Sequence, residues 1–496
     1  MFSVKFRQSF HRLSSIKYSP SILYNKCNWN RQNHQVSSTP VEEALKELKD
    51  IAVTPDQTKA YRKAIQIYNP AYSTEHPGFV AFPNNIQDVQ RCLKVANSTS
   101  TPVIIKSGGH SFAGYSTIDK QGFVISLSHL NNVTVAGDIV TAQAGSNWGN
   151  IYGALEGSKY MAVGGCVPVV GLGGYILGGG YSMLSRAHGG LGCDKVTSYT
   201  MVTADGSQVV TATSDQNTDL FWAMKGGGGG NFGVMVELSL KVEPRPENFI
   251  WKRLFYNNSE SIEQVFNRIG ENLQTFPREL NLDIATHSFS NTRNLTLDAV
   301  YCDHHATIVE AALEALQPQS SSDPKYYKSY LQFTEDYSKR HGFVHYEVEP
   351  IYVKGAMING ISPELANYFA NVDIPRECLI QLVHMGGDIK RFSPTDTSFP
   401  YRSAEYSFYT YGRFIDDSHK KEVFDFSSTA YENVKKSKYA LGSYINYMDR
   451  HLTNWQEEFY GVNYPRLCQI KEKWNPVNKG PLHFEQEIGS SWQPNN

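Results

Sequence analysis

The sequence predicts an α+β fold of two or three domains, and three observations support this. The length of 496 residues, with 41% apolar and 19% charged residues, provides a core of globular size. Residues 77–245 alternate short helices and strands with glycine-rich turns, whereas residues 246–440 alternate longer helices and strands in the manner of an antiparallel sheet. Pro244 and Pro246 stand between these two regions and mark a domain boundary.

The N-terminal part of the chain divides into a basic leader or disordered segment, 1–40, and a mostly helical segment, 41–76. The apolar residues of the latter follow helical spacing, and His76-Pro77-Gly78 ends it, so that the folded unit is expected to begin there. Short elements follow: strands at 79–83, 103–105, 123–127 and on both sides of Gly137-Asp138, and helices after Asn85 and over 148–155. A hairpin around Asp205-Gly206, a helix at 219–224 and a strand at 234–242 complete this domain.

The second domain is expected to contain helices at 259–275, 305–316 and 418–436. Its expected strands lie near 280–288, 294–302, 378–385 and 405–414. The aromatic segment 441–496 closes the chain.

Gly164–Gly180 is the most unusual stretch of the sequence. It combines many glycines with Val, Leu, Ile and Tyr, and neither a helical nor a strand period passes through it. Glycine permits tight bends and close approach of the backbone to another group. A surface loop would carry Ser, Asn and Asp instead, so this stretch predicts buried backbone around a ligand.

Composition excludes several classes of function. The formal net charge of −2 argues against a surface that binds nucleic acid. The sequence contains no run of eighteen apolar residues, so no transmembrane helix is expected. Seven cysteines without regular spacing indicate neither a disulfide framework nor a metal site. Gly228-x-Gly230-x-x-Gly233 follows a helix and precedes a strand, which is the reverse of a nicotinamide-binding turn.

The leader leaves the compartment open. It carries six basic residues before the first acidic residue, Glu42, and resembles a mitochondrial presequence; a disordered basic tail is the alternative. Four sequons would fit secretion, at Asn97, Asn132, Asn257 and Asn294.

Four separated features remain: His110 after two glycines at a strand end, Cys166 within the glycine-rich stretch, the glycine run 226–230, and Tyr444-Ile-Asn-Tyr447. Taken singly, each is ordinary, because loop histidines and packed cysteines or tyrosines are common.

In this order and spacing, the four features resemble the flavin-linked oxidases of the vanillyl-alcohol oxidase superfamily, in particular the berberine-bridge-enzyme-like group. The resemblance rests on Lys106-Ser-Gly-Gly-His110-Ser, Val170-Gly-Leu-Gly-Gly174, Asp219 to Gly233 and the segment from Tyr444 to Pro476. It implies a two-lobed FAD-binding domain of the PCMH type at 77–245, a substrate domain at 246–440, and a C-terminal segment, 441–496, that returns to the FAD-binding domain.

The resemblance also implies a cofactor and its ligands. FAD is expected to be bound covalently through His110, with a second bond through Cys166 left open because that cysteine is displaced by one residue from the family position before Pro168. The residues expected to bind FAD are His110, Cys166, Lys106, Ser107, Gly108, Gly109, Ser111, Val170, Gly171, Gly173, Gly174, Gly178, Gly233 and Asn446.

Catalysis is expected to rest on Tyr447, Gln381 and Tyr444. Tyr447 matches the family's tyrosine base, and its pKa must fall from near 10 to serve at neutral pH; Asn446 and Tyr444 are expected to lower it. Gln381 stands where some members have a glutamate base, which leaves the base role to Tyr447. Leu379 replaces the lysine of plant members, and His384 is a candidate substitute, with packing as the alternative.

The implied activity is that of an oxidase. Val170 resembles the residue of members that use molecular oxygen, so hydride transfer from an alcohol (a sugar or a secondary metabolite) would yield hydrogen peroxide. The alternatives are a carbon–carbon or ring-forming oxidase, a dehydrogenase with another acceptor, and a flavin-fold protein without activity. A monomer is expected. The substrate domain carries no motif that indicates a particular substrate.

Overall fold

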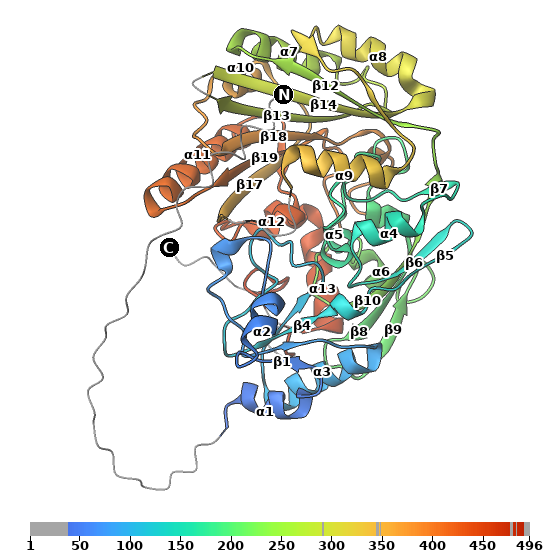
Figure 1. The fold of residues 1–496 in the computed structure, drawn as a ribbon, viewed down its shortest axis with the longest axis vertical. Helices are drawn as coiled ribbons and strands as arrows, with labels where there is room; N and C mark the ends of the chain where they lie inside the picture. Colours follow the sequence, from blue (N-terminus) through green and yellow to red (C-terminus); the bar gives the residue numbers. More distant parts are fainter. Residues whose placement is uncertain are drawn as a thin grey trace.

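The computed structural model describes residues 38–289, 292–343, 347, 349–476, 480–482 and 484–490. The predicted leader therefore lies outside the described residues, except for its last three. Two layers are visible in Figure 1: a large sheet with its helices above, and a lobe of two smaller sheets below. The α+β prediction is confirmed by this arrangement.

The lower lobe contains a four-stranded and a five-stranded sheet. The first has the order β1-β2-β4-β3, in which β2, β4 and β3 are parallel. Its strands are β1 (Ala52–Val53), β2 (Val80–Ala81), β3 (Val103–Lys106) and β4 (Phe123–Ser126). The second is antiparallel and has the order β5-β6-β10-β8-β9. Its strands are β5 (Val133–Ala136), β6 (Ile139–Gln143), β8 (Val196–Thr203), β9 (Val209–Ala212) and β10 (Gly233–Lys241).

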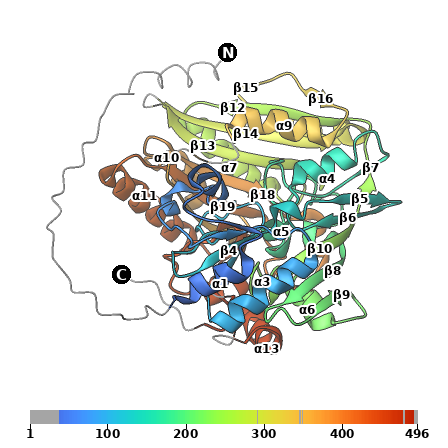
Figure 2. The same cartoon turned by 60° about the horizontal axis from the view of Figure 1, so that its bottom comes forward.

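Short helices cover these sheets: α1 (Pro40–Leu48), α2 (Thr58–Ala64), α3 (Ile86–Thr99), α4 (Trp148–Ala154), α5 (Leu172–Leu177) and α6 (Thr218–Ala223). Helix α3 begins as predicted, since the Asn85 side chain accepts a hydrogen bond from the Asp88 backbone and so caps the first turn. Figure 2 shows α1 and α3 side by side beneath the lobe, where they pack against each other.

Two expectations for this lobe are wrong. The folded unit does not begin after Gly78, because β1 pairs with β2, and Ala44 and Leu48 are fully buried in the common core. The glycine-rich stretch does contain a helix, α5: Leu172 and Ile176 lie one turn apart and are both fully buried, so burial of this apolar face outweighs the low helix propensity of glycine.

The upper domain is built on one antiparallel sheet with the order β15-β12-β14-β13-β18-β19-β17-β20, and β16 pairs with β12. Its strands are β12 (Phe249–Tyr256), β13 (Asn281–Phe289), β14 (Thr292–Cys302), β15 (Ser320–Ser321), β16 (Lys325–Tyr327), β17 (Ile351–Ile358), β18 (Cys378–His384), β19 (Tyr406–Arg413) and β20 (Ala440–Gly442). Every residue of β17 is buried, so it lacks the alternation that marks a half-buried strand.

The helices of the upper domain are α7 (Ser259–Asn272), α8 (Ala306–Ala315), α9 (Tyr330–His341), α10 (Pro363–Asn371) and α11 (Asp417–Lys435). Helix α9 lies on the side of the sheet that faces the lower lobe (Figure 1), and Tyr330 at its start packs against Tyr152 of α4 with ring centroids 5.1 Å apart.

The C-terminal segment joins both layers. Strand β20 pairs with β17 of the large sheet, and the chain then passes through α12 (Trp455–Tyr460) and α13 (Tyr464–Trp474) in the lower lobe. There the Lys471 ammonium donates a hydrogen bond to the Asn231 carbonyl, and Leu482 bridges to Val103 of β3. Another strand pair, β7 (Tyr160–Met161) with β11 (Glu243–Pro244), closes the lobe beside the domain boundary. Among the described residues, no helix is long and apolar enough to cross a membrane.

Candidate active site

A cavity of about 1440 Å³ lies between the glycine-rich turns of the lower lobe and the large sheet. Sites for a single drug-sized ligand occupy roughly 300–1,000 Å³. The cavity therefore has room for a dinucleotide and a small substrate together. Its lower wall consists largely of backbone from the turns after β3 and around α5, and its upper wall consists of side chains on β13, β18 and β19.

The lower wall is shaped by two glycine turns in direct contact. A β-carbon on Gly108 would lie 2.5 Å from the Gly171 backbone, and one on Gly171 would lie 2.4 Å from the Gly108 nitrogen. Ser107 ties the turns together, since its hydroxyl donates to the Ala144 carbonyl at 2.6 Å and accepts from the Gly173 amide at 3.2 Å. Only glycine lets the two backbones come this close, which explains why glycine stands at both positions.

Open space begins beside this contact. A β-carbon on Gly174, which also lines the cavity, would have no atom within 4 Å. The wall is thus smooth exposed backbone, which suits a flat ring system or a pyrophosphate better than it suits a branched side chain.

His110 lies in the cavity wall one residue after Gly109, whose φ of +73° makes the turn that brings the imidazole inward. The ring stacks on Tyr68, with centroids 4.9 Å apart. Tyr68 is held in turn by its hydroxyl, which donates to Glu347 at 3.0 Å, and by its backbone N–H, which donates to the Gly109 carbonyl at 2.8 Å. The histidine is therefore fixed in orientation by the segment that precedes the predicted domain.

Cys166 also lines the cavity. Burial raises the pKa of its thiol to about 12, so the protein alone keeps it as a thiol. The neighbouring backbone is anchored by the Tyr152 hydroxyl, which donates to the Gly165 carbonyl at 2.7 Å.

Fifteen of the seventeen residues predicted for the site line this one cavity: His110, Cys166, Ser107, Gly108, Gly109, Ser111, Val170, Gly171, Gly173, Gly174, Gly233, Asn446, Tyr444, Tyr447 and Gln381. Lys106 and Gly178 do not. The Lys106 ammonium donates to the Ala64 and Gln66 carbonyls instead, at 2.8 and 2.6 Å, and so supports the turn from behind. Gly178 leaves space for Asn446, whose side-chain oxygen would lie 2.0 Å from a β-carbon there.

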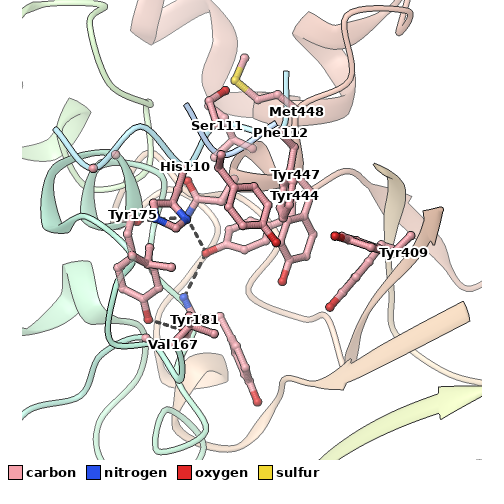
Figure 3. Close-up of a pocket in the computed structure, with 18 of the residues that line it drawn as sticks. His110, Ser111, Phe112, Val167, Tyr175, Tyr181, Tyr409, Tyr444, Tyr447 and Met448 are labelled. Carbon is pink, nitrogen blue, oxygen red and sulfur yellow. Dashed lines mark hydrogen bonds between the residues drawn. The ribbon is translucent and has the colours of Figure 1, made fainter. Parts of the chain in front are cut away.

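Tyr444 has a structural role in addition to its place in the cavity wall. Its hydroxyl oxygen accepts a hydrogen bond from the Tyr181 amide at 3.0 Å (Figure 3). It also accepts from the Gly180 amide at 3.0 Å and from the Asn446 side chain at 2.9 Å. Burial raises the pKa of Tyr444 to about 12, and the hydrogen bonds oppose this rise. The two backbone donors hold the end of the glycine-rich stretch against the C-terminal segment.

Tyr447 lies in a cluster of aromatic rings that includes Tyr409 and Phe112, with centroids 4.6 and 5.7 Å from its own (Figure 3). Burial raises the pKa of Tyr447 well above its usual value, and nearby Tyr444 adds to the rise. A hydrogen bond with Tyr409 opposes it. The expectation that Tyr444 and Asn446 lower this pKa is therefore wrong: the Asn446 amide is committed to Tyr444 and to the Tyr175 carbonyl, and Tyr409 has the expected role.

Gln381 reaches the cavity from the centre of β18, where its direct partner across β19 is Tyr409. Its amide nitrogen donates to Asp283 of β13 at 2.5 Å, and the Tyr337 hydroxyl donates to the other oxygen of the same carboxyl. Burial raises the pKa of Asp283, which is only 6% exposed. Tyrosine, glutamine and aspartate thus form one connected polar group on the sheet side of the cavity.

His384 does not serve the site. Gln381 and Val383 point to the cavity, and because side chains alternate along a strand, His384 points to the opposite face. It is fully buried there and stacks on Tyr406 with centroids 4.9 Å apart, and burial lowers its pKa well below the usual value. Its role is packing.

Among the cavity residues that sequence reasoning missed are Tyr68, Asp283, Tyr337 and Tyr409. Each lies in an ordinary helix, strand or loop without a motif. One weak signal exists for Asp283, since an acidic residue between Leu282 and Ile284 in a buried strand is unusual.

Comparisons with known proteins match two parts of the chain to described families. Residues 77–212 match the family of FAD-binding domains, and residues 443–486 match the family described as berberine and berberine-like. The uncharacterized FAD-linked oxidoreductase YvdP of Bacillus subtilis is 28% identical over 465 residues, which cover 87% of this chain and 96% of the relative. The xylooligosaccharide oxidase of Thermothelomyces thermophilus is 27% identical over 478 residues, which cover 88% and 92%.

The fold is shared with berberine bridge enzyme in complex with (S)-reticuline, at a TM-score of 0.80 and 21% identity, covering 91% of this chain and 99% of the other. Fold, cavity and matched families together define an enzyme that uses FAD for oxidation and reduction. Residues 77–212 and 443–486 thus match an FAD-binding domain and a berberine-like segment, and the chain is similar over most of its length to FAD-linked oxidoreductases.

Proposed function

We propose that the protein is an FAD-dependent oxidase that removes a hydride from an alcohol carbon of a carbohydrate and forms hydrogen peroxide. One observation carries this proposal: the Tyr447 hydroxyl and the Gln381–Asp283 pair enter the same cavity as the glycine backbone and His110. A group that can take a hydroxyl proton therefore shares one space with a wall suited to a flat cofactor.

The residues present fit FAD. The smooth backbone at Gly108, Gly171 and Gly174 would accept the ring system and pyrophosphate, and His110, held by Tyr68, would form a covalent bond to the flavin. Cys166 is the candidate for a second bond, and Val170 would border the path of oxygen. When bound, FAD supplies the acceptor for the hydride and the route of electrons to molecular oxygen.

In this proposal Tyr447 takes the proton of the substrate hydroxyl. Its raised pKa keeps the phenol protonated in the protein alone, so activity should increase toward alkaline pH. Tyr409 stabilises the phenolate by its hydrogen bond. Replacing Tyr409 with Phe should therefore move the increase to higher pH, whereas Tyr326→Phe, at an exposed position, should leave the profile unchanged.

The polar lining of the cavity supports a carbohydrate. Around the sheet end, the lining includes Asp283, His287, Ser288, Arg293, Asn371, Asp373 and Arg376. Side chains of this kind exchange hydrogen bonds with the hydroxyl groups of a carbohydrate. A xylooligosaccharide oxidase is among the relatives, which agrees with this class.

Peroxide release tests the proposal. The purified, FAD-loaded protein is incubated with monosaccharides, xylobiose and longer oligosaccharides, phenolic alcohols and alkaloids. Peroxide with carbohydrates supports the proposal. Peroxide together with a new carbon–carbon bond or ring in a natural product would support the alternative, and reduction of an artificial acceptor without peroxide would indicate a dehydrogenase.

Acid precipitation tests the covalent bonds. Flavin should remain in the pellet of the unaltered protein and of Cys166→Ala. If Cys166 also bonds to the flavin, the His110→Ala pellet remains yellow, and the double variant loses its colour. Flavin released from the unaltered protein contradicts covalent attachment.

A further inference from the structure

Two aspartates face each other directly across neighbouring strands of the substrate sheet. Asp283 of β13 and Asp298 of β14 are register partners, and they are 6% and 2% exposed. Like charges in this position are destabilising, and a buried carboxyl is costly unless it is paired. The arrangement therefore requires an explanation for each residue.

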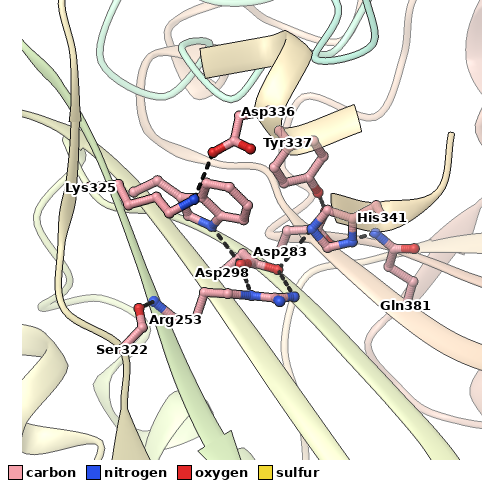
Figure 4. Close-up of polar contacts among 10 residues, drawn as sticks. Arg253, Asp283, Asp298, Ser322, Lys325, Asp336, Tyr337, His341 and Gln381 are labelled. Carbon is pink, nitrogen blue, oxygen red and sulfur yellow. Dashed lines mark hydrogen bonds and ion pairs between the residues drawn. The ribbon is translucent and has the colours of Figure 1, made fainter. Parts of the chain in front are cut away.

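Asp298 has its own cationic partners. Its carboxylate accepts two hydrogen bonds from the Arg253 guanidinium, at 2.6 and 3.1 Å, and one from the Trp251 indole at 2.5 Å, and it pairs with His341 at 3.2 Å (Figure 4). Burial favours its neutral form, but His341 and Arg253 outweigh burial and lower the pKa. Asp298 thus remains ionised, and its place in the sheet is fully accounted for.

Asp283 has a different set of partners. It receives hydrogen bonds from the Gln381 amide nitrogen and the Tyr337 hydroxyl, and it lines the cavity as both of these residues do. Figure 4 shows the Gln381 nitrogen facing the carboxyl and the amide oxygen turned away from it. A glutamine amide has an NH₂ group that donates hydrogen bonds and a carbonyl oxygen that accepts them. Because the Asp283 carboxyl binds the NH₂ group, the carbonyl oxygen of Gln381 faces the other way.

We infer that Asp283 is a positioning residue for the substrate: it fixes the amide of Gln381 with its oxygen available in the cavity, so that Gln381 accepts a hydrogen bond from a substrate hydroxyl. The hydrogen bond from the Tyr337 hydroxyl holds Asp283 in place for this task. The inference rests on the proposed function, because it assigns the substrate hydroxyl group that Gln381 recognises.

A double-mutant cycle tests whether Asp283 acts through Gln381. The variants are Asp283→Asn, Gln381→Ala and the two combined, and Asp336→Asn is the control, because it removes a carboxylate that contacts only Lys325 and Tyr327 among the described hydrogen bonds. Asp283→Asn should raise KM for xylobiose about 5- to 15-fold, the cost of one misdirected neutral hydrogen bond. It should change kcat less, and it should have no further effect in the Gln381→Ala protein.

The same KM increase in both backgrounds would overturn the inference, since Asp283 would then act without Gln381. A lower melting temperature with unchanged KM would also overturn it and leave Asp283 a purely structural residue. Asp336→Asn should match the unaltered protein in KM, which separates the effect from a general loss of carboxylates.

The experiment distinguishes a failure of the proposed function from a failure of the inference about Asp283. If xylobiose is not oxidised, the cycle is repeated with whichever alcohol releases peroxide, and the inference stands or falls on the same coupling. A substrate-free arm uses the melting temperatures of the four FAD-loaded proteins, which should be non-additive because the two side chains share a hydrogen bond. Additive melting temperatures would contradict the contact itself.

Discussion

The two walls of the cavity are built in opposite ways. The lower wall is backbone: Gly108 and Gly171 touch, and Ser107 joins their turns by its hydroxyl. The upper wall is side chains, which β13, β18 and β19 present at alternate positions, with Asp283 and Gln381 among them. A backbone wall tolerates almost no substitution and suits a constant cofactor, whereas a wall of strand side chains can change residue by residue with the substrate.

The largest expected effect concerns the backbone wall. Gly171→Val would bring a branched side chain within 2.5 Å of the Gly108 backbone, where neither turn can yield. We expect a loss of more than about 4 kcal/mol of folding free energy, or folded protein without FAD. Circular dichroism during unfolding measures the loss of stability, and the flavin content of the purified variant measures the loss of FAD.

The matched control is Gly153→Ala, because a β-carbon at Gly153 meets nothing within 4 Å. This variant should fold and bind FAD as the unaltered protein does. Normal flavin content in Gly171→Val would refute the contact between the two turns.

A second prediction concerns the support of the upper wall. Asp298→Asn leaves the partly buried Arg253 and His341 without their carboxylate and should cost about 3–5 kcal/mol at neutral pH. Because the pKa of Asp298 is lowered in the folded state, its stabilisation is present above the ordinary aspartate pKa and is lost as pH falls through the folded value. Denaturant unfolding at several pH values should show this loss in the unaltered protein and not in the variant.

A smaller loss of stability is expected at Tyr444, which joins the glycine-rich stretch to the C-terminal segment. Tyr444→Phe removes the acceptor for the Gly180 and Tyr181 amides and for the Asn446 side chain, and it should destabilise the protein by about 1–3 kcal/mol. The exposed Tyr326→Phe should cost nothing measurable. Equal melting temperatures of the two variants would show that these hydrogen bonds contribute no stability.

The smallest expected effect is a change in how steeply the free energy of unfolding varies with pH. Burial raises the pKa of Asp283, so the folded protein holds this proton more tightly than the unfolded chain does. The stability contributed in this way is present below the ordinary aspartate pKa and falls as pH rises through the folded value, by about 1.4 kcal/mol for each unit of raised pKa. Asp283→Asn should lack this decline; an unchanged slope of stability against pH would contradict it.

The contrast between the walls also explains what the sequence could predict. Glycine turns and His110 occur in continuous motifs, so the lower wall was predictable from the chain alone, together with most helices and strands around it. Lys106 was misassigned because a motif does not show which way a strand side chain points. Strand β17 was missed because full burial removes its alternation.

The upper wall was largely unpredictable for a physical reason. Asp283, Gln381 and Tyr409 lie on three different strands and meet only through sheet register. Tyr68 lies more than forty residues before His110, in a segment without a motif, and joins the site by tertiary packing. No local pattern records such contacts.

Anaerobic reduction of the bound flavin by substrate tests the central claim most directly, since it involves both walls at once. In the unaltered protein, the yellow flavin absorption should bleach on mixing with the carbohydrate that releases peroxide. In Tyr447→Phe, the rate of bleaching should fall about 10²- to 10⁴-fold. Substrate affinity, measured from the dependence of the bleaching rate on substrate concentration, should change little. Equal bleaching rates in the two proteins would contradict the assignment of Tyr447 as the group that takes the substrate proton.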